Sequence, residues 1–418
     1  MNARSGAREA IELSGERQFP ISGSRRGERP VRGRIAEAVL IFAWAIAFLS
    51  AAPALRASEL VDKAAELMIA DGEPHLPPAV PRVGTIRRSA DGQIELVDPK
   101  TNGASPSASL CAANTLCVGK GQEYASLSAA LAVAHERNVI EIAAGMYRES
   151  ATVAVRDLTI RGVDARPHFD CAGVALQAHK ACLLLAADGA TLENLDISGA
   201  EISEEAGLNG ACIRNEPNMS FTLRNVICHQ SQAGLIAQGG IILIEDSEFY
   251  DNGWNEFAHN VSFGGECSVT VRGSVFRDSR VGHEFKSRCF STVIANSIFR
   301  STRGSRDIDI ADGGVTSLYH SILVKTLGTD SKDLIGFASE SCTHPGDMLI
   351  KDVRIINADP DAQIRNFDRC AGHAIFLETV SFEGFPPKKV GYIKDGGAAI
   401  SGLAPPSSGS AIVPLSHP

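Results

Sequence analysis

Polar and ionisable side chains gather in three short segments in the second half of the chain. The segments read HNVSF (259–263), GHEFKSR (282–288) and DIDIAD (307–312), and they follow one another at similar intervals. A lysine can act as a general base when burial or nearby cations lower its pKa. Two carboxylates at a suitable separation can instead hydrolyse a glycosidic bond. The residue types therefore suit proton abstraction or hydrolysis, provided that the fold brings the three segments side by side.

Each of these segments has the alternation of a β-strand, with an apolar centre between polar neighbours. The centres Val261, Phe285 and Ile308 are expected to point inward, as are Ile213, Ile236 and Ile335 of the related segments 211–215, 234–238 and 333–337. Because strand residues alternate faces, the neighbours of these centres are predicted to point outward. The two outward rows are Asn260, Glu284 and Asp307, and Ser262, Lys286 and Asp309.

Adjacent members of a row are expected to lie about 4.8 Å apart, the spacing of paired strands. The register is the critical assumption, because a slip of one residue turns every side chain to the other face. DIDIAD is the place where a slip is easiest, since Ile310 fits the inward position nearly as well as Ile308. A plain cross-strand ion pair between Lys286 and Asp309 is the scaffold alternative to a functional site.

The elements that position these segments belong to a repeat. An apolar pattern recurs with first positions 21 to 32 residues apart, and each unit is too short to bury its own core, which indicates a solenoid of stacked coils. The third position of most units favours a tight turn, because Asn, Asp and Gly adopt left-handed backbone geometry easily. These positions are Asn194, Asn225, Asp246, Gly273, Asn296, His320, Asp352 and Thr379.

The repeats, together with GMYRESATVAVRDLTIRG (145–162), resemble the right-handed parallel β-helix of the pectin-lyase-like family over roughly residues 115–385. The resemblance implies an all-β fold, a single-stranded right-handed parallel β-helix with a short N-terminal capping helix. It is specific for the fold rather than for an activity, because this fold carries lyases, hydrolases, epimerases and proteins that are not enzymes.

GHEFKSR is similar to the strand that carries the catalytic lysine in chondroitinase-B-like and alginate lyases of this fold. This resemblance implies Lys286 as the base, Arg288 as the group that neutralises a uronate carboxylate, and Glu284 as a calcium ligand. In that family the arginine lies on the next coil, where this chain offers Arg303 or Arg306. Calcium is the one cofactor that the resemblance suggests.

The sequence therefore predicts action on an acidic polysaccharide by β-elimination or C5 epimerisation. The first alternative is a non-catalytic carbohydrate-binding or envelope protein, and the second is a glycoside hydrolase that uses Asp307, Asp309 and Asp312. The expected catalytic residues are Lys286, Arg288, His283 and Asp309, and the expected substrate contacts are His259, Asn260, Asp307, Asp312, Arg303 and Arg306.

The N-terminal part differs in composition from the rest. Eight arginines lie between Arg4 and Arg34, and the apolar run 38–54 follows them. We expect residues 1–57 to be a signal peptide or, alternatively, an uncleaved membrane anchor. Either places residues 58–418 outside the cytoplasm, as a secreted or periplasmic protein or one anchored in the inner membrane. The exported part has 31 basic and 44 acidic residues, which excludes a general nucleic-acid binder. We expect a monomer with no membrane contact beyond the anchor.

The segments around the coil are predicted to cover its ends. Residues 58–114 comprise a helix candidate (58–72) and a linker, and residues 126–137 form a capping helix with Ser126 as N-cap. Residues 139–147 are expected to supply the first strand. The tail 386–418, rich in Pro, Gly and Ser, is expected to cover the other end.

Ten cysteines, all in the exported part, suggest disulfides. Cys267 and Cys289, and Cys342 and Cys370, are separated by about one coil, which would place each pair on neighbouring coils within disulfide distance. A ladder of buried free thiols is the alternative, and neither CxxC nor a Cys/His spacing suggests zinc. Cys171–Cys182, Cys212–Cys228 and Cys111–Cys117 are expected as local pairs.

Overall fold

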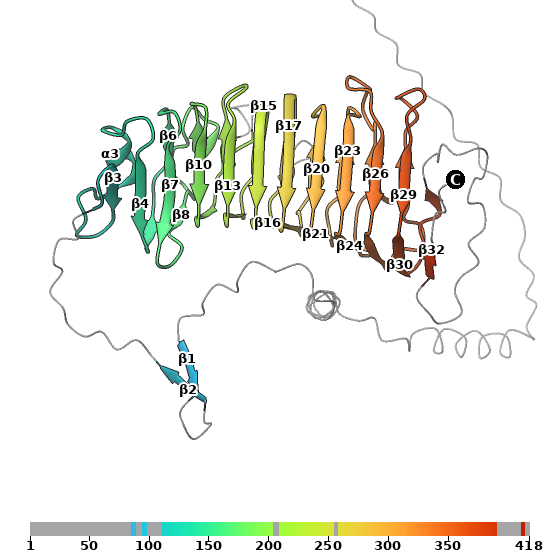
Figure 1. Cartoon of the computed structure of the whole chain (residues 1–418), viewed down its shortest axis with the longest axis horizontal. Coiled ribbons are helices and arrows are strands. Elements are labelled where there is room, and N and C mark those ends of the chain that lie inside the picture. Colours follow the sequence, from blue (N-terminus) through green and yellow to red (C-terminus); the bar gives the residue numbers. More distant parts are fainter. Residues whose placement is uncertain are drawn as a thin grey trace, which may run out of the picture. The chain divides into compact units, whose positions relative to one another are not determined.

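The computed structural model describes residues 85–88, 94–97, 111–203, 209–254, 258–390 and 411–413. Within the unit 57–418, nearly all of these residues belong to a stack of parallel strands (Figure 1). Each coil contributes strands to three faces, which we number in chain order, and every strand pairs with the strand one coil further on. The chain therefore forms a right-handed parallel β-helix, as its repeats predict.

The first and second faces merge into one 19-stranded sheet because β15 and β17 run continuously from one face to the other. The first face consists of β6 (Ala151–Val153), β9 (Ala181–Leu185), β12 (Ala211–Asn215), the first parts of β15 (Ala233–Glu245) and β17 (Val261–Arg272), β19 (Phe285–Ser287), β22 (Ile308–Ile310), β25 (Asp333–Phe337), β28 (Gln363–Asn366) and β31 (Lys389–Val390). The second face consists of β3 (Thr115–Val118), β4 (Val139–Ala143), β7 (Thr159–Val163), β10 (Ala190–Glu193), β13 (Phe221–Arg224), the second parts of β15 and β17, β20 (Ser291–Ala295), β23 (Val315–Tyr319), β26 (Met348–Lys351) and β29 (Ile375–Glu378).

The third face is a separate 11-stranded sheet. Its inward aromatic rings stack from coil to coil, with centroids 5.4 Å apart for Phe249 and Phe276 and 5.0 Å apart for Phe276 and Phe299. The strands are β5 (Met146–Tyr147), β8 (His168–Asp170), β11 (Asp196–Ser198), β14 (Ile227–His229), β16 (Glu248–Tyr250), β18 (Val275–Arg277), β21 (Ile298–Ser301), β24 (Ile322–Lys325), β27 (Arg354–Asn357), β30 (Val380–Gly384) and β32 (Ala411–Val413).

The predicted turn column joins the second face to the third. All eight of its residues have positive φ, from 44° at His320 to 58° at Gly273. Thr379 has φ 54°, although β-branched residues rarely adopt this geometry. The prediction of a left-handed turn at most copies is confirmed, and the stack imposes that turn at the remaining copies as well, even where the local residue disfavours it.

The two ends of the coil follow the prediction in part. Helix α3 (Leu127–Leu131) begins at the predicted N-cap, where the Ser126 side chain accepts a hydrogen bond from the Ala129 N–H, but it ends before residue 137. The expected first strand is wrong, because β3 precedes β4 and pairs with it. In the predicted linker, β1 (Thr85–Arg88) and β2 (Ile94–Val97) form an antiparallel hairpin. At the other end, β32 pairs antiparallel with β30 and covers that edge.

Four of the predicted disulfides are present. Cys267–Cys289 and Cys342–Cys370 join consecutive coils, with Cα atoms 4.6 and 5.1 Å apart, and Cys111–Cys117 and Cys171–Cys182 are local. The predicted Cys212–Cys228 bond is wrong, because both residues are free buried thiols. Each lies inside the coil as an apolar residue would, and burial together with Cys212 raises the pKa of the Cys228 thiol.

The predicted signal peptide or anchor (1–57), the helix candidate (58–72) and most of the C-terminal tail lie outside the described residues. Within the described ranges, the structure contains no helix of the length and apolar character needed to span a membrane.

Candidate functional site

The first face has the predicted register at the three polar segments. Val261, Phe285 and Ile308 pair in sequence and are fully buried, so the slip at DIDIAD does not occur. Lys286 pairs with Asp309 on the next coil. One coil earlier the prediction is wrong by one residue. There Leu235 is the buried partner of both Ile213 and Val261, and Ile236 faces outward.

The predicted outward row of Asn260, Glu284 and Asp307 is wrong, because all three residues are fully buried. Each residue lies just before a first-face strand, where the chain turns from the third face of the preceding coil. The alternation of a strand does not extend through such a corner. We call these residues, with the fully buried Lys325, the interior polar row.

Glu284 is held by protein groups and does not fit a calcium site. Its carboxyl accepts hydrogen bonds from the Ser279 N–H at 3.0 Å and from the Asn260 side-chain amide. Burial, followed by the charge of Asp307, raises the pKa of Glu284 well above its usual range. Calcium binds carboxylate oxygens that can reach the ion, and both oxygens of the fully buried Glu284 are already bonded to protein groups, so this residue does not fit the site that the resemblance implies.

Asp307 and Lys325 are the charged members of the interior polar row. Burial raises the pKa of Asp307 to about 6, although Lys325 and Ser301 oppose the shift. Lys325 Nζ donates to the Ser305 carbonyl at 2.7 Å, and burial lowers its pKa against the nearby Asp307. Asp307 therefore cannot flank a glycosidic bond, and the hydrolase set of Asp307, Asp309 and Asp312 is not assembled.

Outside the coil, a second set of ionisable residues surrounds Asp309, and we call it the outer cluster. Its members are His283, Lys286, Arg288, Arg306, Asp309 and Glu340. Lys286 Nζ lies 2.6 Å from Glu340 Oε1 and 3.9 Å from Asp309 Oδ2. Lys286 is only 7% exposed, and Asp309 is fully buried beneath it. Burial raises the pKa of Asp309, while Arg306, Ser339 and Lys286 oppose that shift.

Two stacked histidines border the outer cluster. The rings of His259 and His283 are 4.8 Å apart, and His259 Nδ1 accepts a hydrogen bond from the His283 N–H at 3.0 Å. His283 Nδ1 accepts from the Arg306 N–H at 3.2 Å, so the proton of neutral His283 is on Nε2, 3.3 Å from Asp309 Oδ2. Burial, then the nearby cations, lowers the pKa of both histidines well below the usual range.

Glu340 is a member of the outer cluster that the sequence prediction missed. It pairs with Lys286 and also with Arg288, whose Nε lies 2.6 Å from Glu340 Oε2. Partial burial alone would raise the pKa of Glu340, but hydrogen bonds from Arg288 and Lys286 lower it to about 2. Its position was a usable signal, because Arg288, Asp312 and Glu340 all follow the end of a first-face strand by one to three residues on consecutive coils.

Arg306 connects the outer cluster to an exposed group of arginines. It bonds Asp309 at 3.2 Å and Asp333 at 3.0 Å, and its guanidinium lies 5.2 Å from the ring of Phe367. The guanidinium groups of the exposed residues Arg365 and Arg369 lie 4.1 and 5.3 Å from the same ring. We call Arg306, Arg365, Arg369 and Phe367 the arginine platform.

A glycine makes this arrangement possible. Gly336 pairs with Asp309 on one side and with Arg365 on the other, so it lies between the outer cluster and the arginine platform. A Cβ atom there would come within 2.9 Å of Asp309 Oδ1 and 3.0 Å of Arg306 Nε. Lys286, Asp309, Gly336 and Arg365 thus occupy one outward row on four coils, and the sequence prediction missed Arg365 because it ended at Gly336.

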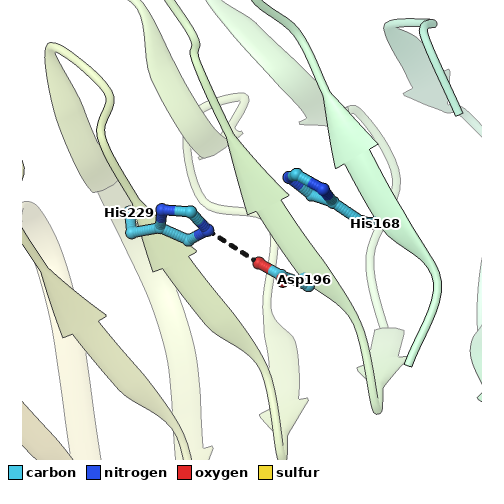
Figure 2. A group of neighbouring side chains, drawn as sticks. All are labelled: His168, Asp196 and His229. Carbon is cyan, nitrogen blue, oxygen red and sulfur yellow. Dashed lines mark hydrogen bonds and ion pairs between the residues drawn. The ribbon is translucent and has the colours of Figure 1, made fainter. Parts of the chain in front are cut away.

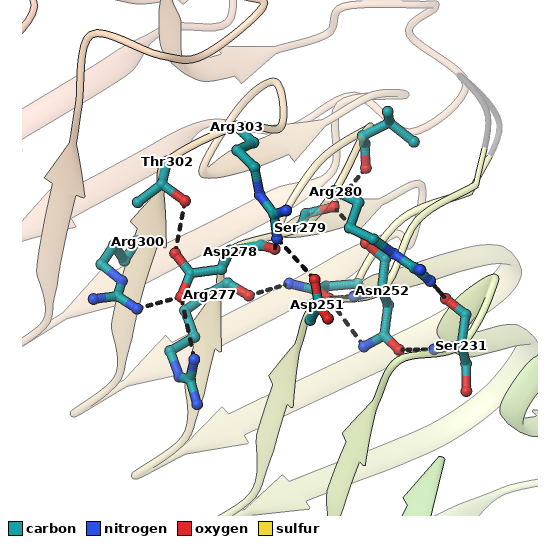
Figure 3. A network of polar contacts seen from close by, with 12 residues as sticks. Ser231, Asp251, Asn252, Arg277, Asp278, Ser279, Arg280, Arg300, Thr302 and Arg303 are labelled. Carbon is teal, nitrogen blue, oxygen red and sulfur yellow. Dashed lines mark hydrogen bonds and ion pairs between the residues drawn. The ribbon is translucent and has the colours of Figure 1, made fainter. Parts of the chain in front are cut away.

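The remaining predicted residues lie elsewhere. Arg303 donates to Asp251 at 2.7 Å and to the Asp278 carbonyl at 3.3 Å, within a separate network of arginines and aspartates (Figure 3). Asp312 accepts a hydrogen bond from the Ser341 hydroxyl at 2.9 Å. Of the two next-coil arginines, only Arg306 belongs to the outer cluster.

The outer cluster can neutralise an anion and relay protons. Lys286, Arg288 and Arg306 are cations whose partners are Glu340, Asp309 and Asp333, so the cluster as a whole is close to electrically balanced. The exposed Arg365 and Arg369 add positive charge beside it. An anionic ligand that displaced Glu340 would therefore meet Lys286 and Arg288 directly.

No protein-family model matches the sequence, and no curated protein matches it either. Solved structures with a similar fold include a pectin methylesterase from Aspergillus niger, with 14% identity, a TM-score of 0.40 and coverage of 70% of this chain and 93% of that one. Pectate lyase Pel9A has 14% identity, a TM-score of 0.42 and coverage of 63% and 72%. A lacto-N-biosidase from Eubacterium ramulus has 11% identity, a TM-score of 0.36 and coverage of 65% and 68%.

Because these scores are low, the assignment of the fold rests on the strand pairing of this chain. The three faces, the coil-to-coil register and the column of left-handed turns all belong to one architecture. The chain is a right-handed parallel β-helix protein.

Proposed function

We propose that this chain is an exported β-helix protein that binds an acidic polysaccharide at the outer cluster and acts on it by β-elimination or C5 epimerisation. The observation that carries the proposal is the row of Lys286, Asp309, Gly336 and Arg365 along the first face. It presents a possible base and an exposed cation at the fixed pitch of the coils. An extended polymer with a carboxylate on each sugar would meet such a row unit by unit.

In β-elimination, a base removes the C5 proton, the bond from C4 to the leaving oxygen breaks, and that oxygen takes a proton. Lys286 is the proposed base, and Arg365 with Arg306 is proposed to neutralise the uronate carboxylate, which stabilises the charge that develops after proton removal. In epimerisation the proton returns to the opposite face of C5 and no bond to oxygen breaks. Both reactions require Glu340 to leave Lys286, since the two side chains are in contact at 2.6 Å.

The same contact supports a rival function, which is glycan binding without reaction. Lys286, Arg288 and His283 each have a fixed partner, and Lys286 and His283 are almost fully buried. The exposed part of the arginine platform is on its own a suitable surface for a carboxylate-bearing sugar. In this non-catalytic function, Arg365 and Arg369 bind the glycan, and the outer cluster only stabilises the strands of the first face.

The test is a panel of alginate, pectate, chondroitin and bacterial exopolysaccharides, with ultraviolet detection of unsaturated products and NMR analysis of uronate configuration. We expect one substrate to react, and the Lys286→Met variant to abolish the reaction. Lys351→Met is the matched control, because Lys351 of β26 forms a Lys–Glu ion pair with Glu378 of β29, away from the cluster. Reaction by Lys286→Met at the wild-type rate would refute the catalytic proposal.

Binding is measured separately from reaction. Arg365→Gln is expected to weaken glycan binding about tenfold, a loss typical of one charged hydrogen bond. Arg354→Gln on β27 is the control, because Arg354 pairs with Glu383 on the third face. If the Arg365 variant loses binding while no product forms with any substrate, the non-catalytic alternative holds.

A further inference from the structure

The third face carries a group of potential metal ligands that the proposed function does not use. His168 of β8, Asp196 of β11 and His229 of β14 are partly buried, and one ligand atom of each lies within 4.8 Å of the other two. Figure 2 shows the imidazole rings of the two histidines on either side of the Asp196 carboxylate. Among the described residues this is the one group of at least three His, Cys, Asp or Glu side chains placed in this way.

Strand pairing fixes the positions of these residues. Asp196 pairs with His168, and His229 pairs with Ser198, so the three residues come from three consecutive coils. Their neighbours Phe169, Ile197 and Cys228 are fully buried in the core. By alternation, His168, Asp196 and His229 therefore project from the outer side of the sheet.

The surroundings also fix the imidazole rings. The ring of His229 stacks between those of His168, at 5.9 Å, and Tyr250, at 4.9 Å. The Arg277 guanidinium lies 4.0 Å from the centre of the Tyr250 ring, and Arg277 Nε is held by Glu248 at 2.6 Å. The other nearby cation, Arg166, is held by the side-chain oxygen of Asn225. Neither arginine forms an ion pair with Asp196 within the described residues, so its carboxylate is available to a cation.

Protein contacts leave the group incompletely satisfied. His229 Nε2 lies 3.0 Å from Asp196 Oδ1, and His168 Nε2 lies 2.7 Å from the Ser198 hydroxyl. His229 Nδ1 is buried and has no hydrogen-bond partner within the described part of the chain. Because His229 Nε2 is the nitrogen that faces Asp196, it is Nε2 and not this Nδ1 that would bind an ion.

We propose that His168, Asp196 and His229 bind a divalent transition metal of the Zn²⁺ class. Two imidazoles and one carboxylate are a donor set that Zn²⁺ accepts, and three protein ligands leave a position for water. Bonds of about 2.0 Å place the ligands of a tetrahedral ion roughly 3.3 Å apart, which is close to the observed 3.0 Å between His229 and Asp196. The ion would join three consecutive coils.

The alternative is that these residues form only a hydrogen-bonded ladder on the surface of the sheet. Asp196→Asn separates the two possibilities, because an asparagine oxygen can still accept from His229 but lacks the negative charge that a metal requires. Ser198→Ala is the complementary variant. It removes the contact of Ser198 with His168, so a ladder would be weakened while metal binding would be unchanged or stronger.

The experiment is calorimetric titration of the chelator-treated full-length protein with Zn²⁺, together with visible absorption of the Co²⁺ complex, which reports tetrahedral coordination. We expect one ion per chain for the wild type. His168→Gln, Asp196→Asn and His229→Gln are expected to bind Zn²⁺ at least about tenfold more weakly. His179→Asn is the control, because His179 is an exposed histidine with φ 54°, a geometry that asparagine tolerates.

Thermal unfolding of the wild type with and without Zn²⁺ keeps the proposal testable if a variant fails to fold, since a ligand that binds the native state raises Tm. No Zn²⁺ binding by the wild type, or equal binding by Asp196→Asn, would overturn the proposal. Loss of binding on replacement of the buried thiols Cys212 and Cys228, rather than of the three proposed ligands, would also overturn it.

Discussion

On the coil that contains β19, Glu284 and Lys286 are only two residues apart, yet they belong to different environments. Glu284 lies in the interior polar row, where its partners are Asn260 and a backbone N–H. Lys286 lies in the outer cluster, where its partner Glu340 is 41% exposed. Inside the coil, burial dominates and shifts pKa values toward neutral forms. At Glu340 in the outer cluster, hydrogen bonds from Arg288 and Lys286 outweigh burial and keep the carboxylate charged.

The comparison separates residues that support the fold from residues that a ligand can reach. Asp307 and Asp309 illustrate the same division on the next coil, since both are fully buried but only Asp309 contacts the outer cluster. Charged residues of the same type can therefore have different roles two positions apart. Variants that exchange or remove these charges are the direct way to test the division.

The largest decrease in the free energy of unfolding is expected from Lys325→Met. This change removes the fully buried cation whose charge favours the ionised form of Asp307, and a buried carboxylate that loses its compensating charge costs about 3–5 kcal/mol. Lys286→Met in the outer cluster should cost less, because Asp309 keeps its contact with Arg306 and the partly exposed Glu340 keeps its contact with Arg288. Chemical denaturation at pH 7 measures both values, and equal losses would contradict the division between the two regions.

A double variant sharpens this prediction. Asp307→Asn should restore much of the stability lost in Lys325→Met, because no uncompensated carboxylate then remains. Lowering the pH should act in the same direction, since Asp307 takes up a proton at about pH 6. A Lys325→Met protein that is no more stable with the second change or at pH 5 would show that the two side chains are not coupled.

The next largest effect is the pH dependence that Asp307 gives to the free energy of unfolding of the wild-type protein. The pKa of Asp307 is about 6 in the native state and 3.8 for an unperturbed aspartate, so between these values the native state binds more protons than the unfolded state. The contribution of Asp307 to the free energy of unfolding is therefore greatest below pH 4. It falls by about 2–3 kcal/mol as the pH rises through 6. Asp307→Asn should lack this decrease. Denaturation midpoints at pH 4.5 and 7 for both proteins provide the measurement.

The smallest effect on the free energy of unfolding is expected from the titration of Glu340. The pKa of Glu340 is about 2, below the 4.5 of an unperturbed glutamate, so its contribution to stability is complete above pH 4.5 and is lost as the pH falls toward 2. Because the side chain is 41% exposed, solvent screening limits the contribution to about 1 kcal/mol. Glu340→Gln should flatten the pH dependence in this range. A loss above 2 kcal/mol at pH 7 would mean that Glu340 supports the fold and is not a displaceable partner of Lys286.

Sequence periodicity was sufficient to predict the strands, the left-handed turns and the pairing of Lys286 with Asp309. These features depend on alternation and on turn residues, both of which are local properties. The same reasoning failed at Asn260, Glu284 and Asp307, because each lies at a corner where alternation ends. It also failed at Ile236, where Leu235 and Ile236 are equally apolar and only the neighbouring coils decide which one is buried.

Residues contributed by loops were harder to predict. Glu340 reaches Lys286 across more than fifty positions of sequence, and a charge in a turn gives no indication of its partner. The ligands proposed for Zn²⁺ were missed for a related reason. His168 and Asp196 are the first residues of their strands, whereas His229 is the last residue of its strand. They therefore form no regular spacing motif and become a group only when three coils are stacked in register.

The two disulfides between coils have a consequence for the mechanics of the protein. Parallel coils are otherwise joined only by hydrogen bonds and side-chain packing. A force that pulls on the ends of the β-helix would therefore separate its coils one after another. Cys267–Cys289 and Cys342–Cys370 keep their coils joined however far that peeling has advanced. The residues from His283 to Glu340 lie between these two points in the stack. The coils that carry the outer cluster, where a polysaccharide is proposed to bind, are therefore linked to their neighbours by a disulfide at each end.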